Sequence, residues 1–170
     1  YITYDKGDKM QTFMPYQSYT RVAKTLDYKR LGKQRVEGMQ THNQLTKGKG
    51  GYPHHPINKM WEGYESSLAE YTNAMITEWI ARGYNNSMEF IKCCDYLIVS
   101  EDNLLSHYMP TYMKFIDRSY LYDHMKPPWI YDRKVRVSHQ SNLLRKDWNY
   151  YSKHFGTHIG TNLPYIWAKG

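Results

Sequence analysis

Apolar side chains recur at steps of three and four residues between positions 57 and 82, which predicts a long amphipathic helix. The residues on this stripe are Ile57, Met60, Trp61, Tyr64, Leu68, Tyr71, Met75 and Trp79. A stripe of this kind packs against a hydrophobic core. Gly83 follows the pattern, where glycine often ends a helix. We therefore expect a core built from packed helices.

The rest of the chain also favours helices over strands. Helices are predicted over 18–26, 28–45, 87–99 and 132–155, with one or two short ones in the tyrosine-rich stretch 101–126. Ser18 is a candidate N-cap of the first of these. Short extended pieces are expected at 11–16, where Pro15 disfavours helix in the residue before it, and at 163–167. The predicted class is all-α, a single compact domain of about five to seven helices.

The first nine residues look unlike the remainder. The run 5–9, just before Met10, back-translates into a purine-rich stretch that resembles a bacterial ribosome-binding site. We interpret Met10 as the natural start and residues 1–9 as an upstream extension that is disordered or was introduced during expression. Residues 10–170 then form one domain, in keeping with their length.

Composition points to a basic protein rich in aromatic side chains. Lys and Arg number 23 against 16 Asp and Glu, which gives a formal net charge of +7, and there are 18 Tyr and 5 Trp. Such a surface suits a polyanion whose bases stack on rings, although it also suits a basic protein with no such partner. The two cysteines are adjacent and form no disulfide framework or zinc ligand set, which favours the cytoplasm. No apolar run is long enough to span a membrane.

One helical face carries an unusual set of polar residues. Arg30, Lys33, Gln34 and Glu37 share it at steps of three and four. Cations that bind phosphate, beside a carboxylate that handles protons, would explain the set. A solvated face with an ordinary Lys33–Glu37 pair is the alternative.

Further candidates for contact with a polyanion lie elsewhere in the chain. They are Arg35, Lys47 and Lys49 of a glycine-rich loop, His55, and, on the mostly polar stretch 138–146, His139, Gln140, Asn142, Arg145 and Lys146. Arg and Lys suit phosphates, whereas Asn and Gln suit base edges. The His54–His55 pair has no third ligand at suitable spacing, so we predict a capping or groove role rather than metal binding. No cofactor is predicted.

Several blocks resemble bacterial and phage proteins related to pyrimidine-dimer DNA glycosylase, the phage endonuclease V type. They are 10–16, 26–27, 30–37, 55–56, 60–61, 78–79, 82–83, 138–147 and 163–167. The resemblance implies a helical enzyme that binds duplex DNA containing a damaged or modified base, extrudes the nucleotide and cuts its glycosidic bond. In the phage enzyme an N-terminal amine attacks the sugar to form an imine, a nearby glutamate assists, and β-elimination follows at the abasic site.

The chain departs from that pattern in two places. Gln11 is too bulky for efficient removal of Met10, and Arg30 stands where the phage enzyme has its glutamate. We therefore interpret Lys33 as the candidate nucleophile and Glu37 as the acid–base group, with the chain terminus or water as alternative nucleophiles. The leading hypothesis is a monomeric DNA glycosylase, possessing or lacking abasic-site lyase activity. The alternatives are a non-catalytic DNA- or RNA-binding module and a protein-interaction protein with an incidental basic surface.

Overall fold

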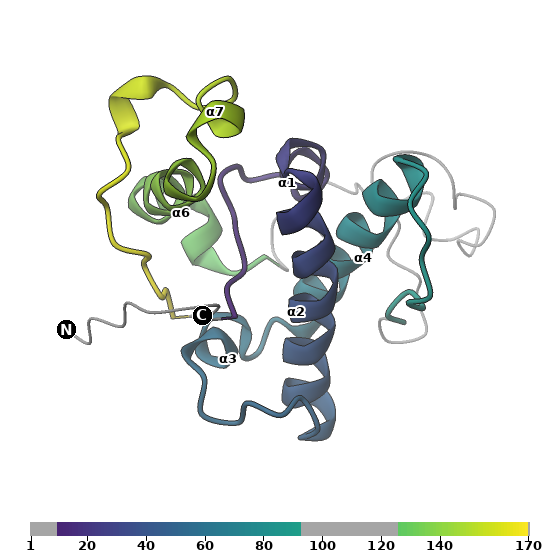
Figure 1. Cartoon of the computed structure of the whole chain (residues 1–170). Coiled ribbons are helices and arrows are strands. Elements are labelled where there is room, and N and C mark those ends of the chain that lie inside the picture. The colour runs from purple at the N-terminus through teal and green to yellow at the C-terminus, as the bar shows by residue number, and fades with distance from the viewer. Residues whose placement is uncertain (1–9, 93–125, 170) are drawn as a thin grey trace, which may run out of the picture.

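The computed structural model describes residues 10–92 and 126–169, and these are helical with connecting segments and no strand (Figure 1). The helices are α1 (Tyr19–Thr25), α2 (Tyr28–Lys47), α3 (Pro56–Trp61), α4 (Glu65–Ala81), η3 (Pro128–Tyr131), α6 (Arg133–Lys146), α7 (Trp148–Tyr151) and η4 (Thr157–Ile159). The all-α prediction is confirmed. No helix within the described ranges is long and apolar enough to cross a membrane.

Helices α2 and α4 pack closely and form the centre of the fold. Asp27 caps α2 by accepting hydrogen bonds from the backbone N–H groups of Lys29 and Arg30, at 2.9 and 3.2 Å. Gly48 ends the helix at φ 64°, a left-handed conformation that glycine adopts without strain. Along the contact, Gly38 lies directly against the Thr72 side chain of α4, and a Cβ at position 38 would overlap it.

An extended segment, residues 11–16, lies between α2 and α6 (Figure 1). Its apolar side chains enter the main core, where Phe13 and Met14 are buried with Trp61 and Tyr71. Trp61 also donates from Nε1 to Thr12 Oγ1 at 3.0 Å. The predicted extended piece at 11–16 is therefore a central element of the fold.

Two long helices predicted from the sequence are each divided in the structure. The helix predicted over 57–82 is α3 followed by α4, because Gly63 at φ 82° breaks the helical path between them. The helix predicted over 132–155 ends at Lys146. Asp147 leaves helical geometry there, at φ −155° and ψ 88°, and its side chain caps α7.

The helix predicted over 87–99 is wrong for the part that the structure describes. Residues 84–92 have no helical structure. Asn73 of α4 instead bonds Ile91 at both polar groups, accepting from its N–H at 2.8 Å and donating to its carbonyl at 3.0 Å. This exchange holds residues 84–92 against α4. Residues 93–99, the short helices predicted up to residue 125 and the extension 1–9 lie outside the described residues.

The close α2–α4 contact predicts that Gly38→Ala destabilises the protein. Overpacking costs about 1–3 kcal/mol, against a gain of up to about 1 kcal/mol in helix propensity. Urea unfolding of Gly38→Ala should therefore show a lower midpoint than the wild-type protein. Thr72→Ala removes the overlapping side-chain atoms, so the double variant should recover stability relative to Gly38→Ala. A double variant no better than the single one would place the strain elsewhere.

Candidate active site

Side chains from both flanking helices bind the backbone of the extended segment. From α2, Gln34 accepts from Phe13 N–H at 3.1 Å and donates to the Gln11 carbonyl at 2.8 Å. From α6, His139 Nδ1 accepts from Met14 N–H at 3.0 Å, and Gln140 donates to the Pro15 carbonyl at 2.9 Å. These bonds replace the neighbouring strand that an isolated extended segment lacks.

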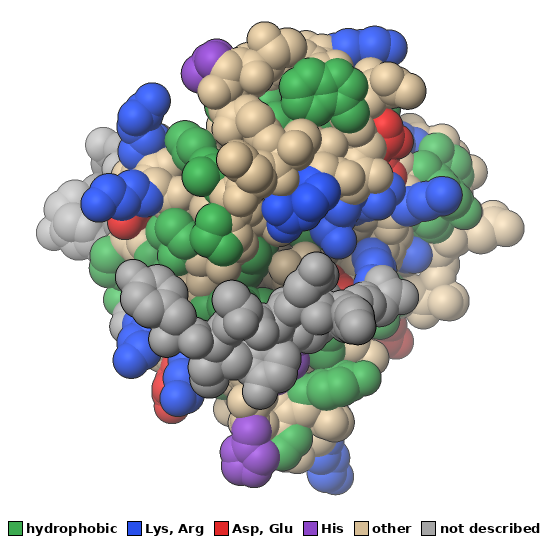
Figure 2. Space-filling model, turned by 60° about the vertical axis from the view of Figure 1, so that its left-hand side comes forward, with side chains coloured by type: hydrophobic (Ala, Val, Ile, Leu, Met, Phe, Trp, Pro, Cys, Tyr) green, Lys and Arg blue, Asp and Glu red, His purple; other side chains and the backbone are tan. Residues whose placement is uncertain are grey.

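A pocket of about 270 Å³ opens beside this segment, on the face of α2 that carries the charged stripe. It is lined by Gln11, Phe13, Lys29, Arg30, Lys33, Gln34, Glu37 and Lys146. Figure 2 shows Lys and Arg side chains gathered across the middle of one face of the molecule. A larger cavity lies at the other end of α2, but this pocket combines a buried carboxyl with four cations. We therefore take it as the candidate active site.

Glu37 is the buried acid of the pocket, with a side chain only 7% exposed. Its Oε2 accepts from Gln11 N–H at 3.3 Å and from Gln34 Nε2 at 2.9 Å. Burial raises the pKa of Glu37 to about 7, while the Lys33 charge, these two hydrogen bonds and Lys146 act against the rise. The carboxyl can therefore both accept and release a proton near neutral pH.

Gln34 fixes the position of that carboxyl. Its Oε1 accepts from Phe13 N–H and, at 2.5 Å, from the hydroxyl of Tyr71. Because both of these partners are donors, the amide atom that they contact must be the oxygen. The nitrogen Nε2 therefore faces Glu37. Gln34 is 1% exposed and makes four hydrogen bonds. It therefore orients Glu37 and holds the segment, with no polar atom left over for a base edge.

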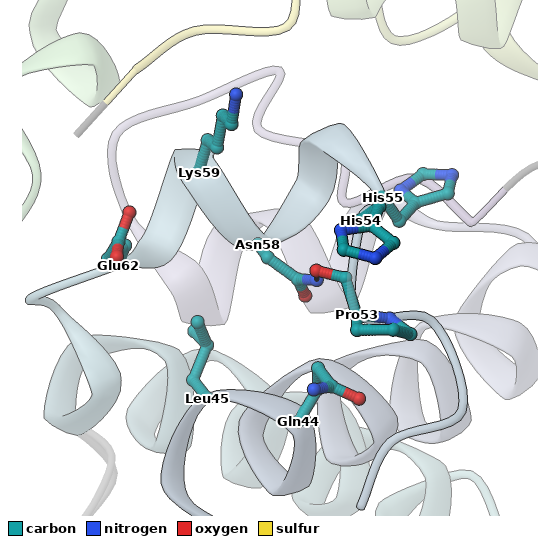
Figure 3. Close-up of a pocket in the computed structure, with 8 residues that line it drawn as sticks. All are labelled: Gln44, Leu45, Pro53, His54, His55, Asn58, Lys59 and Glu62. Carbon is teal, nitrogen blue, oxygen red and sulfur yellow. Dashed lines mark hydrogen bonds between the residues drawn. The ribbon is translucent and has the colours of Figure 1, made fainter. Parts of the chain in front are cut away.

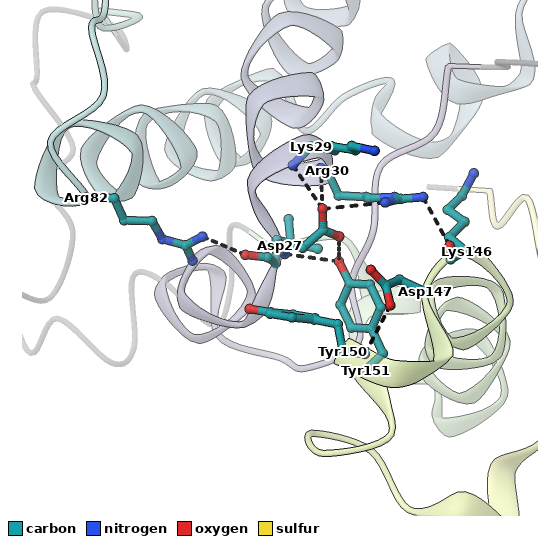
Figure 4. A network of polar contacts seen from close by, with 9 residues as sticks. Asp27, Lys29, Arg30, Arg82, Lys146, Asp147, Tyr150 and Tyr151 are labelled. Atoms are coloured by element: carbon teal, nitrogen blue, oxygen red, sulfur yellow. Dashed lines mark hydrogen bonds and ion pairs between the residues drawn. The ribbon is translucent and has the colours of Figure 1, made fainter.

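Four cations line the same pocket as the carboxyl: Lys29, Arg30, Lys33 and Lys146. Lys33 Nζ lies 3.8 Å from Glu37 Oε1 and its side chain is 46% exposed, so it reaches both the acid and the solvent. Arg30 approaches Asp27 at 3.5 Å and donates to the Lys146 carbonyl at 3.4 Å. Asp27 also accepts from the Tyr151 hydroxyl at 2.5 Å (Figure 4). These contacts hold the end of α6, and with it Lys146, against α2.

Three other predicted DNA contacts in the stretch 138–146 do not line the pocket. They bind the C-terminal tail or the extended segment 11–16 instead. His139 is fully buried, stacks on Tyr165 and contacts the Ile166 carbonyl through Nε2 at 3.3 Å. Asn142 donates to the Leu163 carbonyl at 3.2 Å, and Arg145 donates to the Thr161 carbonyl at 2.8 Å. The tail at 163–167 is thus extended and packed on α6, as predicted. Polar side chains of α2 and α6 thus meet around the segment that lies between the two helices.

The remaining predicted DNA contacts lie away from the pocket. The guanidinium of Arg35 stacks 3.9 Å from the Trp79 ring and donates to Asn86 at 2.7 Å. His55 caps α3 by accepting from Ile57 N–H, which is the predicted capping role. Lys47 and Lys49 are exposed at the far end of α2, and Lys47 lies about 21 Å along the helix axis from Lys33.

Three lining residues, Gln11, Phe13 and Lys29, escaped the sequence reasoning. Lys29 precedes Lys33 by four residues, so the spacing of the charged stripe could have included it. Gln11 contributes its backbone N–H to Glu37, which no sequence pattern reveals. Lys146, a predicted DNA contact, also lines the pocket and comes from α6.

The helices hold a carboxyl with a pKa near 7 among several cations. This combination defines a candidate enzyme that acts on a polyanion. The family model for pyrimidine dimer DNA glycosylase matches residues 10–92, just under half of the chain. Over these residues, which include α1 to α4, the chain is similar to the pyrimidine dimer DNA glycosylase family. This similarity supports a DNA glycosylase of DNA repair as the general function. Comparison with curated proteins and with solved structures gives no match.

The raised pKa of Glu37 predicts how Glu37→Gln changes stability with pH. Between about pH 4.5 and 7 the folded protein keeps a proton on Glu37 that the unfolded chain releases, so this group makes the wild type less stable as pH rises. Glu37→Gln cannot ionise and retains an oxygen for both donors. Its stability relative to wild type should therefore increase from pH 5 to pH 8, by up to about 3 kcal/mol. Chemical denaturation at both pH values measures this, and an unchanged difference would refute the pKa shift.

Proposed function

We propose that the protein is a DNA glycosylase that excises a damaged or modified base from double-stranded DNA, with Glu37 as the acid–base group and Lys33 as the nucleophile. One observation carries the proposal: Lys33 Nζ lies 3.8 Å from a buried carboxyl whose pKa is near 7, within a pocket lined by four cations. The family match over the same helices supports it. We further propose that it acts as a monomer in the cytoplasm.

The pocket suits a nucleotide extruded from the duplex. A glycosidic carbon within stacked DNA is inaccessible, so the enzyme must bring the nucleotide out. The pocket volume of about 270 Å³ is close to the lower end of small-ligand sites, roughly 300 Å³. Phe13 offers a ring at the wall, while Lys29, Arg30 and Lys146 surround the opening with positive charge for the flanking phosphates.

The proposed reaction consists of cleavage of the glycosidic bond, opening of the sugar ring and β-elimination. Glu37 takes a proton from the Lys33 ammonium, and the neutral amine attacks C1′ of the extruded sugar. The C1′–N bond to the base breaks as the Lys33–C1′ bond forms, and the proton on Glu37 passes to the departing base. Opening of the sugar ring moves a proton from the attached nitrogen to O4′ and gives a protonated imine between Lys33 and C1′. Glu37, ionised again after its proton has passed to the base, would then take a C2′ proton as the 3′ phosphate departs, a β-elimination that cleaves the strand.

Direct hydrolysis is the alternative within the same site. Ionised Glu37 would take a proton from a water molecule that attacks C1′, and no imine would form. The short Lys33–Glu37 distance favours the amine route, since the carboxyl is already placed to remove the ammonium proton. A non-catalytic DNA-binding module would use the same cations and release no base.

Substitution at the acid and at the amine should separate these routes. With DNAs carrying different damaged or modified bases, wild type should release one base class and become covalently trapped by borohydride. Lys33→Met should abolish both signals, because it removes the only attacking amine of the proposal. Glu37→Gln should reduce base release by at least about a hundredfold, since an amide cannot carry the proton.

Lys29→Met is the matched control for Lys33→Met. Lys29 lines the same pocket one helical turn away, so this variant should lose at most one phosphate contact and keep both signals. Base release that persists in Lys33→Met without trapping would establish the water route. No base release from any damaged DNA by wild type, together with tight DNA binding, would establish the binding module.

The basic rim predicts a strong salt dependence of DNA binding. If the three cations of the rim, Lys29, Arg30 and Lys146, neutralise three phosphates, the affinity should fall about fortyfold between 50 and 200 mM salt. Lys146→Ala should lower the slope of log affinity against log salt by about 0.9. Lys134→Ala, at the opposite end of α6 and about 18 Å away along its axis, should leave the slope unchanged. Fluorescence anisotropy with a labelled duplex measures these slopes, and a flat salt response would exclude the rim as the DNA contact.

A further inference from the structure

The cavity of about 350 Å³ at the C-terminal end of α2 faces α3 (Figure 3), whereas α4 reaches the candidate active site through one buried side chain. This side chain is that of Tyr71, which is fully buried. Its hydroxyl lies 2.5 Å from Gln34 Oε1, 3.1 Å from the Phe13 carbonyl and 3.2 Å from Phe13 N–H. The reaction proposed above makes no use of this hydroxyl.

The hydroxyl of Tyr71 has a single proton, and the contact distances indicate where it points. Of the two acceptors in reach, Gln34 Oε1 lies at 2.5 Å and the Phe13 carbonyl at 3.1 Å, so we assign the proton to the bond with Gln34. Phe13 N–H is shared between Gln34 Oε1 and the tyrosine oxygen. Burial raises the pKa of Tyr71 well above its ordinary value, so the hydroxyl keeps its proton near neutral pH.

Gln34 transmits the effect of this bond to Glu37. Its Nε2 uses both hydrogens, one on the Gln11 carbonyl at 2.8 Å and one on Glu37 Oε2 at 2.9 Å. Donation to Oε1 polarises the amide and strengthens donation from Nε2. If the amide turned over, its oxygen would meet two acceptors, the Gln11 carbonyl and the carboxylate. The hydroxyl of Tyr71 therefore keeps the amide in place and favours the ionised form of Glu37.

Charged and titrating groups face Glu37 from α2, α6, α4 and the C-terminal tail. In the described part of the chain they are Lys29, Arg30, Lys33, Lys146, Tyr71 and Tyr165. Burial favours the neutral form of the carboxyl, and Lys33 and Lys146 favour the ionised form. Lys33 is 46% exposed, so water screens part of its charge. The bond from Gln34 is buried and is not weakened in this way, so the carboxyl should respond to a change in that bond.

We propose that Tyr71 is a positioning residue for Glu37: through Gln34, it holds the carboxyl in the orientation that proton transfer with Lys33 requires. The catalytic part of this role rests on the proposed glycosylase function, whereas the hydrogen-bond chain from Tyr71 to Glu37 can be tested without DNA. Tyr71 is fully buried and does not line the pocket, so it acts on the reaction only through the carboxyl.

Tyr71→Phe tests the chain directly. The variant loses the hydroxyl and keeps the ring, which packs on Tyr19 and Trp61. The Glu37 carboxyl is titrated in the full-length protein and followed by carbon NMR. Its ionisation constant should fall at least about threefold, a rise of about 0.5 in its pKa, because the carboxylate loses part of its hydrogen bonding. An unchanged titration would overturn the proposal.

Tyr19→Phe is the matched control. Tyr19 is also buried, its hydroxyl bonds Ser67 Oγ at 2.5 Å, and its ring meets that of Tyr71 edge-on. Loss of this hydroxyl leaves the chain to Glu37 intact, so the carboxyl should titrate as it does in wild type. An equal shift in both variants would show a general loosening of the core and would also overturn the proposal.

The wild-type protein provides a test that does not depend on the folding of either variant. The NMR resonance of Tyr71 Cζ senses the hydrogen bonding of its hydroxyl, so it should move at the pH where Glu37 titrates. The resonance of Tyr19 Cζ should not follow that titration, because the hydroxyl of Tyr19 bonds Ser67 instead. A Tyr71 resonance that is indifferent to the titration of Glu37 would overturn the proposal.

The pH dependence of base release distinguishes positioning from a purely structural role. The proposed reaction starts from ionised Glu37, so the acid limb of kcat/KM should move to higher pH in Tyr71→Phe. Base release should be at least about threefold slower than wild type at pH 6 and nearly equal at pH 8.5. An equal loss at both pH values would contradict a positioning role. If wild type released no base, the glycosylase proposal would fail, and the NMR titration alone would decide whether Tyr71 positions Glu37.

Discussion

The hydrogen bonding of one extended segment, residues 11–16, determines how the rest of this fold is placed. No strand lies beside it in the described part of the chain, so its backbone groups are bound by side chains of α2 and α6. Leaving buried backbone groups unpaired would cost about 1–3 kcal/mol each, so these contacts are required for a stable core. Because Gln34 and Glu37 both bind Gln11, the same contacts that secure the segment also place the catalytic candidate.

Sequence periodicity predicted the helical class and most helices, but not their breaks. The apolar stripe from 57 to 82 continues across Gly63, because residues on both sides face one core. Only the backbone conformation of that glycine shows that two helices contribute to the stripe. In 87–92 the local pattern predicted part of a helix, yet long-range hydrogen bonds to Asn73 decided the structure. Tertiary contacts override local preference in such short segments.

The site was predictable to the extent that it lies on one helix. Helical spacing placed Arg30, Lys33 and Glu37 together, and the pocket contains all three. Arg35 shares the same stretch, but its guanidinium is held by an aromatic ring of α4. The polar residues of α6 looked like DNA contacts because no local partner was visible. Their partners are backbone groups far away in the chain, as His139 binds Met14 across 125 residues.

Helices α2 and α6 also place two titrating groups on either side of segment 11–16, and the pKa values of these groups are shifted in opposite directions. Burial lowers the pKa of His139 to about 4 and raises that of Glu37 to about 7. Between about pH 4.5 and 6.5 the folded protein lacks a proton that unfolded His139 would bind, which makes stability rise with pH. Over the same range the folded protein keeps a proton on Glu37 that the unfolded chain would release, which makes stability fall as pH rises. The two slopes oppose each other, so these two groups together make stability depend little on pH in this range. Below pH 6.5, the buried neutral imidazole of His139 on α6 thus offsets the pH dependence of stability that Glu37 on α2 introduces.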